Sequence, residues 1–260
     1  MKISILMSVY NPNDKYFKLC LDSIEQQSYK DFELILVDDG TTNLNLEEML
    51  SHYSFDYKII HNSQNLGLAR SLNIGMSMCT GEYIARMDDD DIMMPNRLEM
   101  QLKYAEENDV VLFSNISLID DNNNSLSDFN SKIIAEDFDI KKYLLKSGNC
   151  LAHSTLFIKT KILKDVKGYD ERFVYSQDYS LYLKLFDKYK FKRLSERLVQ
   201  YRIPFNRITV LKKILTLLSC YAAYVDYLNT HRSAINYWYF VRRSLSLIKM
   251  MYVYSKEKHK

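Results

Sequence analysis

Residues 32–40 read Phe-Glu-Leu-Ile-Leu-Val-Asp-Asp-Gly, an apolar run that stops abruptly at two aspartates and a glycine. The run has the length and composition of a buried strand, and its end has the composition of a turn. Further strand-like runs occupy residues 3–9, 57–60 and 82–86, and helical patterns at residues 14–27, 46–53 and 68–78 separate the runs. This alternation predicts right-handed β-α-β units in an α/β domain with a mostly parallel sheet.

Conspicuous acids follow two of these strands. Asp38 and Asp39 come after one strand, and the tetrad Asp88 to Asp91 comes after another. Ligands of such sheets bind at the carboxyl ends of the strands, so both acidic segments are expected at one ligand-binding edge. Four adjacent carboxylates repel one another, and a hard divalent cation such as Mg²⁺ or Mn²⁺ would relieve that repulsion. A solvated acidic turn is the alternative interpretation of the tetrad.

Three other positions are candidate site residues, each with a structural alternative. Arg70 lies in the first turn of a helix whose N-terminal amides suit an anion, although a plain helix start has the same pattern. Asp178 begins a later helix, as an ordinary N-terminal acid or as an exposed general base. His153 lies in residues 150–159, which predict a strand, and there a half-buried structural histidine is favoured over a ligand-binding one.

Composition narrows the class of protein. The chain has 260 residues, 13% of them aromatic, and a net charge of +2, which argues against disorder and gives no signature of nucleic-acid binding. Its four cysteines are far apart and form no C-x-x-C pair, so neither a disulfide scaffold nor a zinc ribbon is indicated. The N-terminus lacks the pattern of a signal peptide, and a cytosolic location is expected.

The charge is unevenly distributed along the chain. Residues 207–260 contain ten Lys and Arg against two Asp and Glu, so an acidic body precedes a basic, aromatic-rich tail. The longest uncharged run in the tail, residues 214–225, is shorter than the roughly 20 residues that span a bilayer. Aromatic side chains beside cations favour peripheral docking at a membrane surface. Helices packed on the body and homodimerisation through the tail are the alternatives.

Taken in order, five motifs resemble the family 2 glycosyltransferases of the GT-A fold. They are Ile5-Leu6-Met7-Ser8-Val9-Tyr10-Asn11; residues 23–40; Asn65-x-Gly67-x-Ala69-Arg70-x-x-Asn73; Gly81-Glu82-Tyr83-Ile84; and Asp88-x-Asp90-Asp91 followed by Pro95-x-Arg97-Leu98-x-x-Gln101. The resemblance is strong over residues 1–104 and looser to about residue 205. It implies a Rossmann-like sheet and a catalytic domain over residues 1–205, divided into a nucleotide-sugar and metal half (1–104) and an acceptor half (105–205). Residues 206–260 are expected to form a helical extension.

The resemblance also implies residue roles at the donor site. Ser8 and Tyr10 are expected to line a uracil pocket, Tyr10 by stacking, and Asp39 is expected to accept a hydrogen bond from the uracil N3–H. Arg70 is a further expected donor contact.

For the acidic tetrad the resemblance implies a metal site. Asp88 and Asp89 are expected near the ribose and the metal, with Asp88 a second metal ligand. Asp90 is expected to hold Mn²⁺ or Mg²⁺ directly against the two phosphates of the donor.

The resemblance assigns the catalytic base to Asp178, because Gln177 replaces the first member of the acidic pair that the family usually has there. His153 is expected beside the acceptor. Pro204 follows Tyr201-Arg202-Ile203 where many relatives have a nearby histidine, and the Q-x-x-R-W motif of processive members is missing, so single addition is favoured.

These features predict an inverting, metal-dependent transfer of one hexose, galactose or glucose, from a UDP-sugar to a sugar acceptor. The resemblance is nearest to enzymes of O-antigen and capsule synthesis, so the acceptor is expected on undecaprenyl diphosphate and the enzyme on the inner face of the cytoplasmic membrane. Two rivals are a sugar-nucleotide pyrophosphorylase and an inactive membrane-associated scaffold. A pyrophosphorylase would need a glycine-rich basic loop where the chain has Tyr10-Asn11-Pro12. The scaffold would require loss of the metal or base acids.

Overall fold

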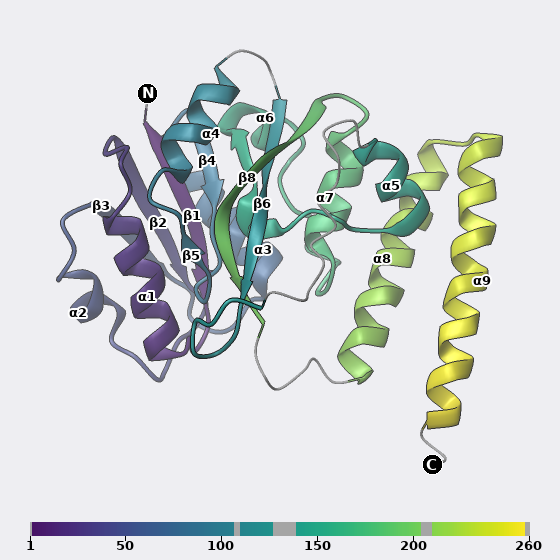
Figure 1. Cartoon of the computed structure of the whole chain (residues 1–260), viewed down its shortest axis with the longest axis horizontal. Coiled ribbons are helices and arrows are strands. Elements are labelled where there is room, and N and C mark those ends of the chain that lie inside the picture. The colour runs from purple at the N-terminus through teal and green to yellow at the C-terminus, as the bar shows by residue number, and fades with distance from the viewer. Residues whose placement is uncertain (1, 107–109, 127–138, 204–209, 258–260) are drawn as a thin grey trace. The chain divides into compact units, whose positions relative to one another are not determined.

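The computed structural model describes residues 2–106, 110–126, 139–203 and 210–257 (Figure 1). The chain divides into two compact units. The first comprises residues 1–138, 151–169 and 189–205, and the second comprises residues 139–150, 170–188 and 206–260. The tail thus groups with two segments of the body. The predicted domain boundary between residues 205 and 206 lies outside the described residues and stays a prediction, as does the division at residue 104.

An eight-stranded sheet forms the centre of the first unit, with the strand order β3-β2-β1-β4-β7-β6-β8-β5. The strands are β1 (Ile3–Val9), β2 (Phe32–Asp38), β3 (Asp56–His61), β4 (Tyr83–Arg86), β5 (Ile92–Met93), β6 (Val110–Ile119), β7 (Phe157–Lys159) and β8 (Lys190–Arg202). Strands β3, β2, β1 and β4 are mutually parallel, as are β6 and β8. Strand β7 runs antiparallel to β4 and β6, and β5 runs antiparallel to β8.

Helices connect and cover these strands. In the first unit they are α1 (Asp14–Glu25), α2 (Leu46–Leu50), α3 (Leu68–Met78), α4 (Arg97–Ala105) and α6 (Thr160–Asp165), with a 3₁₀ turn, η1, at His153–Thr155. The second unit contains α5 (Ile140–Ser147), α7 (Gln177–Leu185), α8 (Val210–Thr230) and α9 (Ala234–Glu257). The predicted α/β architecture with a mostly parallel sheet is confirmed.

The core of the first unit explains why β1 and β2 are so apolar. Every residue of β2 is buried, because helices cover both faces of the parallel part of the sheet. Helix α1 buries Phe17, Leu21 and Ile24, spaced one helical turn apart, against one face. Helix α3 approaches the other face closely at Gly75, where an added Cβ would lie 2.5 Å from Leu6 Cδ1.

The stretch predicted as a strand at residues 150–159 is mostly not one. Only Phe157–Lys159 is extended, and His153 lies in η1, so its predicted place in a strand is wrong. The Thr155 backbone N–H and hydroxyl both donate to the Ala152 carbonyl oxygen, at 3.0 and 2.7 Å. This local bonding competes with extension into a strand.

The second unit is helical. Helix α8 buries Cys220, Ala223 and Tyr224, while α9 leaves much of its apolar surface exposed. Among the residues that the structure describes, no helix is both long enough and apolar enough to cross a bilayer.

Candidate functional site

The carboxyl ends of β1, β2 and β4 meet at one edge of the sheet, as the parallel topology requires. The Asp39 backbone N–H donates to the Val9 carbonyl oxygen at 2.8 Å, which joins the ends of β1 and β2. Ser8 is half-buried at the end of β1, and the Tyr10 side chain is 52% exposed just beyond it. Four predicted donor-site positions, Ser8, Tyr10, Asp39 and Asp88, therefore follow or end three adjacent parallel strands.

The loop that carries Tyr10 is fixed to the loop after β2. Asn11 adopts a left-handed conformation with φ of 47°, which asparagine tolerates better than most residues. Its side-chain oxygen accepts from the Thr42 backbone N–H at 2.8 Å, and its own N–H donates to the Thr41 hydroxyl at 3.3 Å. The exposed ring of Tyr10 thus lies on a loop that hydrogen bonds hold to the loop after β2.

Asp39 is buried, and its carboxylate holds the segment that leads into α3. Oδ1 accepts from the Asn62 side-chain amide at 2.9 Å and the Leu66 backbone N–H at 2.8 Å, and Oδ2 accepts from the Gly67 backbone N–H at 2.9 Å. A carboxylate has about four acceptor positions, so these three bonds leave one on Oδ2. Arg70 is exposed in the first turn of α3, directly beyond this segment.

The neighbouring carboxylate, Asp38, pairs within the protein. Its Oδ2 lies 2.9 Å from His61 Nδ1, and its Oδ1 accepts from the Thr41 backbone N–H at 2.7 Å. Burial by itself would raise the pKa of Asp38, but the hydrogen bonds from Thr41 and His61 outweigh it and hold this pKa below its usual value. Asp38 therefore joins the loop after β2 to the end of β3.

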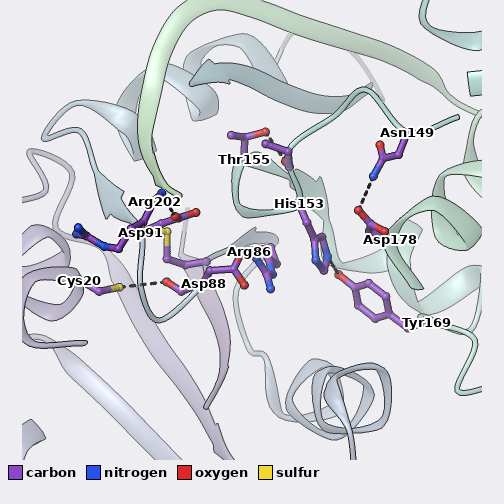
Figure 2. A network of polar contacts seen from close by, with 12 residues as sticks. Cys20, Arg86, Asp88, Asp91, Asn149, His153, Thr155, Tyr169, Asp178 and Arg202 are labelled. Atoms are coloured by element: carbon purple, nitrogen blue, oxygen red, sulfur yellow. Dashed lines mark hydrogen bonds and ion pairs between the residues drawn. The ribbon is translucent and has the colours of Figure 1, made fainter. Parts of the chain in front are cut away.

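The tetrad after β4 is not uniform, and its first member has a cationic partner. The buried guanidinium of Arg86, the last residue of β4, forms an ion pair with the Asp88 carboxylate. From the other side, Cys20 Sγ donates to the Asp88 carbonyl oxygen at 3.3 Å (Figure 2). Asp88 is therefore oriented by α1 and β4 together.

Asp89 and Asp90 are half-buried and carry negative charge that is poorly compensated. Burial, together with the charges of Asp90 and Asp88, raises the pKa of Asp89 to about 7. Burial and the charge of Asp88 raise the pKa of Asp90 to about 6. A bound cation would relieve this repulsion, and carboxylate oxygens are the ligands that Mg²⁺ and Mn²⁺ prefer.

Across the described ranges, no three His, Cys, Asp or Glu side chains form a group that could hold a metal ion. An ion of the magnesium type usually takes one or two carboxylates and completes its shell with water and substrate phosphates. Asp88 and Asp90 fit that kind of site, rather than a cage made entirely of protein ligands.

The last aspartate has a structural role. Asp91 is 1% exposed, and its Oδ1 accepts from the Arg202 backbone N–H at 2.8 Å. The Arg202 side chain also contacts the tetrad, because its Nε donates to the Asp90 carbonyl oxygen at 2.9 Å. Its guanidinium also stacks 4.2 Å from the centre of the Tyr16 ring. The end of β8 thus clamps the tetrad (Figure 2).

The buried side chain of Arg97 contacts the strand end that precedes the tetrad. Arg97 Nη2 donates to the Arg86 carbonyl oxygen at 2.8 Å, and Nε donates to Gln101 Oε1 at 2.9 Å. Gln101 in turn donates to the Thr155 carbonyl oxygen. Burial and the charge of Arg86 lower the pKa of Arg97 to about 9. The Pro95-x-Arg97-Leu98-x-x-Gln101 motif therefore joins the end of β4 to the segment at Thr155 through buried hydrogen bonds.

His153 belongs to the first unit and is buried. Its Nε2 lies 2.7 Å from the Tyr169 hydroxyl, and the two rings meet edge to face (Figure 2). Burial, together with the charge of Arg86, holds the pKa of His153 well below its usual value, so the imidazole is neutral. Asn73, the last residue of its motif, fixes Tyr169 through two hydrogen bonds to the Tyr169 backbone.

Asp178 belongs to the second unit, in the first turn of α7. The helix is preceded by Ser176 in a left-handed conformation with φ of 59°. Asp178 Oδ2 accepts from the Asn149 side-chain amide, and Oδ1 accepts from the Tyr179 backbone N–H at 2.7 Å (Figure 2). These two contacts hold the half-buried carboxylate in one orientation, which a general base also requires.

Three residues that support these acids were not predicted from the sequence. Arg86, Arg202 and Asn149 contact Asp88, Asp91 and Asp178 respectively. Arg86 could have been found, because an arginine at the end of a buried strand directly before four aspartates has an evident partner. Arg202 and Asn149 are distant in sequence from the acids they touch, and only the fold brings them together.

Known proteins with sequences similar to this chain are glycosyltransferases. A family model described as "Glycosyl transferase family 2" matches residues 4–184. An uncharacterised glycosyltransferase of Methanocaldococcus jannaschii is 40% identical over 218 residues, covering 82% of this chain and 74% of that protein. The O-antigen biosynthesis glycosyltransferase WbnJ of Escherichia coli is 34% identical over 207 residues, covering 77% of this chain and 79% of that protein.

Solved structures of similar fold include residues 1–349 of Staphylococcus aureus TarS in complex with UDP-GlcNAc. The superposition has a TM-score of 0.73 at 19% sequence identity and covers 95% of this chain and 73% of that one. At this identity the likeness shows the fold.

Proposed function

Because the chain belongs to glycosyltransferase family 2, we propose that it transfers a single hexose from a UDP-sugar to a hydroxyl of a glycan acceptor, with inversion and with the help of Mn²⁺ or Mg²⁺. The observation that carries this proposal is the set of acids at the carboxyl ends of β2 and β4. Asp39 is buried and keeps one acceptor position, and Asp89 and Asp90 share poorly compensated charge. Such an edge suits a nucleotide diphosphate with its metal ion.

The donor would be held by residues of the first unit. Tyr10 would stack on the uracil, Ser8 would line its pocket, and the free acceptor position of Asp39 would take the N3–H. Arg70 would add a positive charge near the phosphates. The complex of TarS with UDP-GlcNAc supports a UDP-sugar donor, since that protein has the same fold.

The metal ion would be held by Asp90, with Asp88 as a second ligand and Asp89 near the ribose. When bound, such an ion supplies positive charge to the departing diphosphate. Arg86 pairs with Asp88, and Arg202 donates to the Asp90 carbonyl oxygen. These contacts would hold the two proposed ligands in position before the ion binds.

Asp178 would act as the base. As the acceptor oxygen bonds to the anomeric carbon, the bond from that carbon to the UDP oxygen breaks and the acceptor proton passes to Asp178. The Asn149 side-chain amide donates to Asp178 Oδ2 and would limit the movement of this carboxylate. Attack opposite the leaving group inverts an α-linked donor, so a β linkage results. His153 would flank the acceptor site as a neutral side chain that is paired with the Tyr169 hydroxyl.

The acceptor is proposed to be a glycan on undecaprenyl diphosphate. O-antigen synthesis by the relative WbnJ and amylovoran synthesis by AmsE of Erwinia amylovora support a role in surface polysaccharide assembly. The basic tail would then hold the enzyme at the inner face of the cytoplasmic membrane. We propose galactose or glucose as the transferred sugar.

Donor hydrolysis tests the proposal. UDP release is followed across UDP-galactose, UDP-glucose and UDP-GlcNAc, with and without Mn²⁺. The expected result is slow, metal-dependent UDP release from a UDP-hexose. An acceptor should accelerate this release in the unaltered protein but not in Asp178→Asn. Binding of no nucleotide sugar at all would contradict the donor assignment, and equal release after chelation would contradict the metal assignment.

A further inference from the structure

A cavity of about 280 Å³ lies within the second unit, among α5, α8 and α9. Its walls combine three cationic side chains with apolar ones, namely Lys146, Arg242, Arg243, Leu217, Tyr221 and Leu247. Among its lining residues none is acidic. A hollow of this composition suits an anionic group that is attached to an apolar one.

The central cation is held in a fixed orientation. Arg243 lies 4.6 Å from the centre of the Tyr224 ring and 5.3 Å from that of Tyr179, and its Nη1 donates to the Tyr179 hydroxyl. Its partners are aromatic faces and a phenol, so its positive charge is not cancelled by these contacts. A pre-oriented guanidinium loses little conformational freedom when it binds a phosphate.

An exposed apolar stripe runs along α9 beside this cavity. Ile235, Trp238, Val241, Leu245 and Ile248 recur every three or four residues and are 54% to 63% exposed. Arg242 connects the stripe to the cavity, because it lines the cavity and its guanidinium lies 5.9 Å from the centre of the Trp238 ring. A helix face that is this apolar and this exposed indicates a partner.

Charge decides between two kinds of partner. A second copy of α9 would bring two basic segments together, since residues 207–260 hold ten Lys and Arg against two Asp and Glu. An anionic membrane surface would instead attract the basic residues of this segment. Trp side chains with flanking cations are also typical of membrane interfaces.

We propose that the cavity at Lys146, Arg242 and Arg243 binds the phosphate headgroup of an anionic membrane phospholipid, while the stripe on α9 enters the acyl region beside it. This inference deepens the membrane part of the proposed function and rests on it. It adds a defined site, made by α5 and α9 together, to the general attraction of a basic tail.

The test compares two triple variants that lose the same charge. Lys146→Gln/Arg242→Gln/Arg243→Gln removes the cavity cations, and Lys142→Gln/Lys188→Gln/Arg232→Gln removes three exposed cations of the second unit that lie outside the cavity. Binding of the full chain is measured by co-sedimentation with vesicles of phosphatidylcholine alone and of phosphatidylcholine mixed with phosphatidylglycerol. Both variants lose the same long-range attraction to the anionic surface, but only the cavity variant also loses the proposed contacts to the phosphate headgroup. The cavity variant should therefore bind the mixed vesicles roughly tenfold or more weaker than the control variant.

Because Arg243 also contacts Tyr179 and Tyr224, the double variant Lys146→Gln/Arg242→Gln repeats the test with these contacts intact. Equal weakening of the cavity and control variants would overturn the site. Failure of the unaltered chain to bind either vesicle would overturn membrane docking as well, and self-association through α9 in solution would assign the stripe to a second copy. Donor hydrolysis needs no vesicles, so it reports on glycosyl transfer separately.

Discussion

Asp90 and Asp91 are adjacent, yet their surroundings predict opposite consequences of substitution. Asp90 is half-buried at the proposed metal site, whereas Asp91 is buried and accepts a hydrogen bond from the backbone of β8. Asp90→Ala should leave the thermal midpoint nearly unchanged and lower Mn²⁺-dependent UDP release roughly a hundredfold or more, as expected when stabilisation of the leaving group is lost. Asp91→Ala should destabilise the fold by about 1–3 kcal/mol, because the Arg202 N–H loses its acceptor.

Turnover and thermal midpoint are measured on both variants, with Asp165→Ala, an exposed position in α6, as the control. If Asp90→Ala retained normal turnover at saturating metal, the assignment of Asp90 as a ligand would be wrong.

The ion pairs of His61 contribute to the stability of the fold in a pH-dependent way. It lies 2.9 Å from Asp38 and 2.7 Å from Glu47, and the hydrogen bond to Asp38 is the main reason that its pKa is raised above 6.5. A raised folded-state pKa contributes stability that is complete below pH 6.5 and is lost as the pH rises through the raised value. The side chain is 51% exposed, so solvent screens the pair, and the contribution is at most about 1 kcal/mol.

His61→Gln should therefore lower the thermal midpoint at pH 5.5, by up to about 4 °C, and change it little at pH 9. Thermal unfolding at the two pH values checks this. The control is His52→Gln, at an exposed position that does not contact Asp38. A larger loss at pH 9 than at pH 5.5 would contradict the sign.

At the scale of an element, the packing of α3 on the sheet depends on one missing side chain. A Cβ at Gly75 would lie 2.5 Å from Leu6 Cδ1 and 2.8 Å from Val37 Cγ2, both on fully buried residues. Gly75→Ala should therefore destabilise the first unit by about 1–3 kcal/mol, even though alanine favours a helix more than glycine does. Ser77→Ala, at an exposed position of the same helix, should be nearly neutral. Chemical denaturation of both variants makes the comparison.

The elements themselves were largely predictable from the sequence. Strand β1 and helix α3 have the predicted bounds, because their apolar periodicity is regular and turns flank them. The 3₁₀ turn at His153–Thr155 was not predictable, since its cause is a pair of local hydrogen bonds to Ala152 inside an apolar run. The same limit applies to the site: the acids stand out in sequence, whereas Arg202 reaches them only through the pairing of β8 with β5 and β6.

At the scale of the whole molecule, the tail is part of a folded unit. Helix α8 buries Tyr224, Tyr227 and Leu228 within the second unit, and Arg243 of α9 contacts Tyr179. A chain that ends at residue 203 should therefore lose the order of residues 139–150 and 170–188. The expected signs are low soluble yield and fast hydrogen exchange in α7, while β1 and β2 stay protected. Retained protection of α7 would show that the tail is dispensable.

The order of the segments along the chain has a consequence for synthesis on the ribosome. The second unit combines three segments of the chain, and the ribosome synthesises the third, residues 206–260, after all the others. At roughly 5–20 residues per second, α7 leaves the exit tunnel several seconds before α8 follows. During that interval the apolar side chains of α7, among them Tyr179 and Leu181, have no α8 to cover them. Nascent chains whose emerged part ends at residue 188 should recruit chaperones more strongly than chains whose emerged part extends to residue 230.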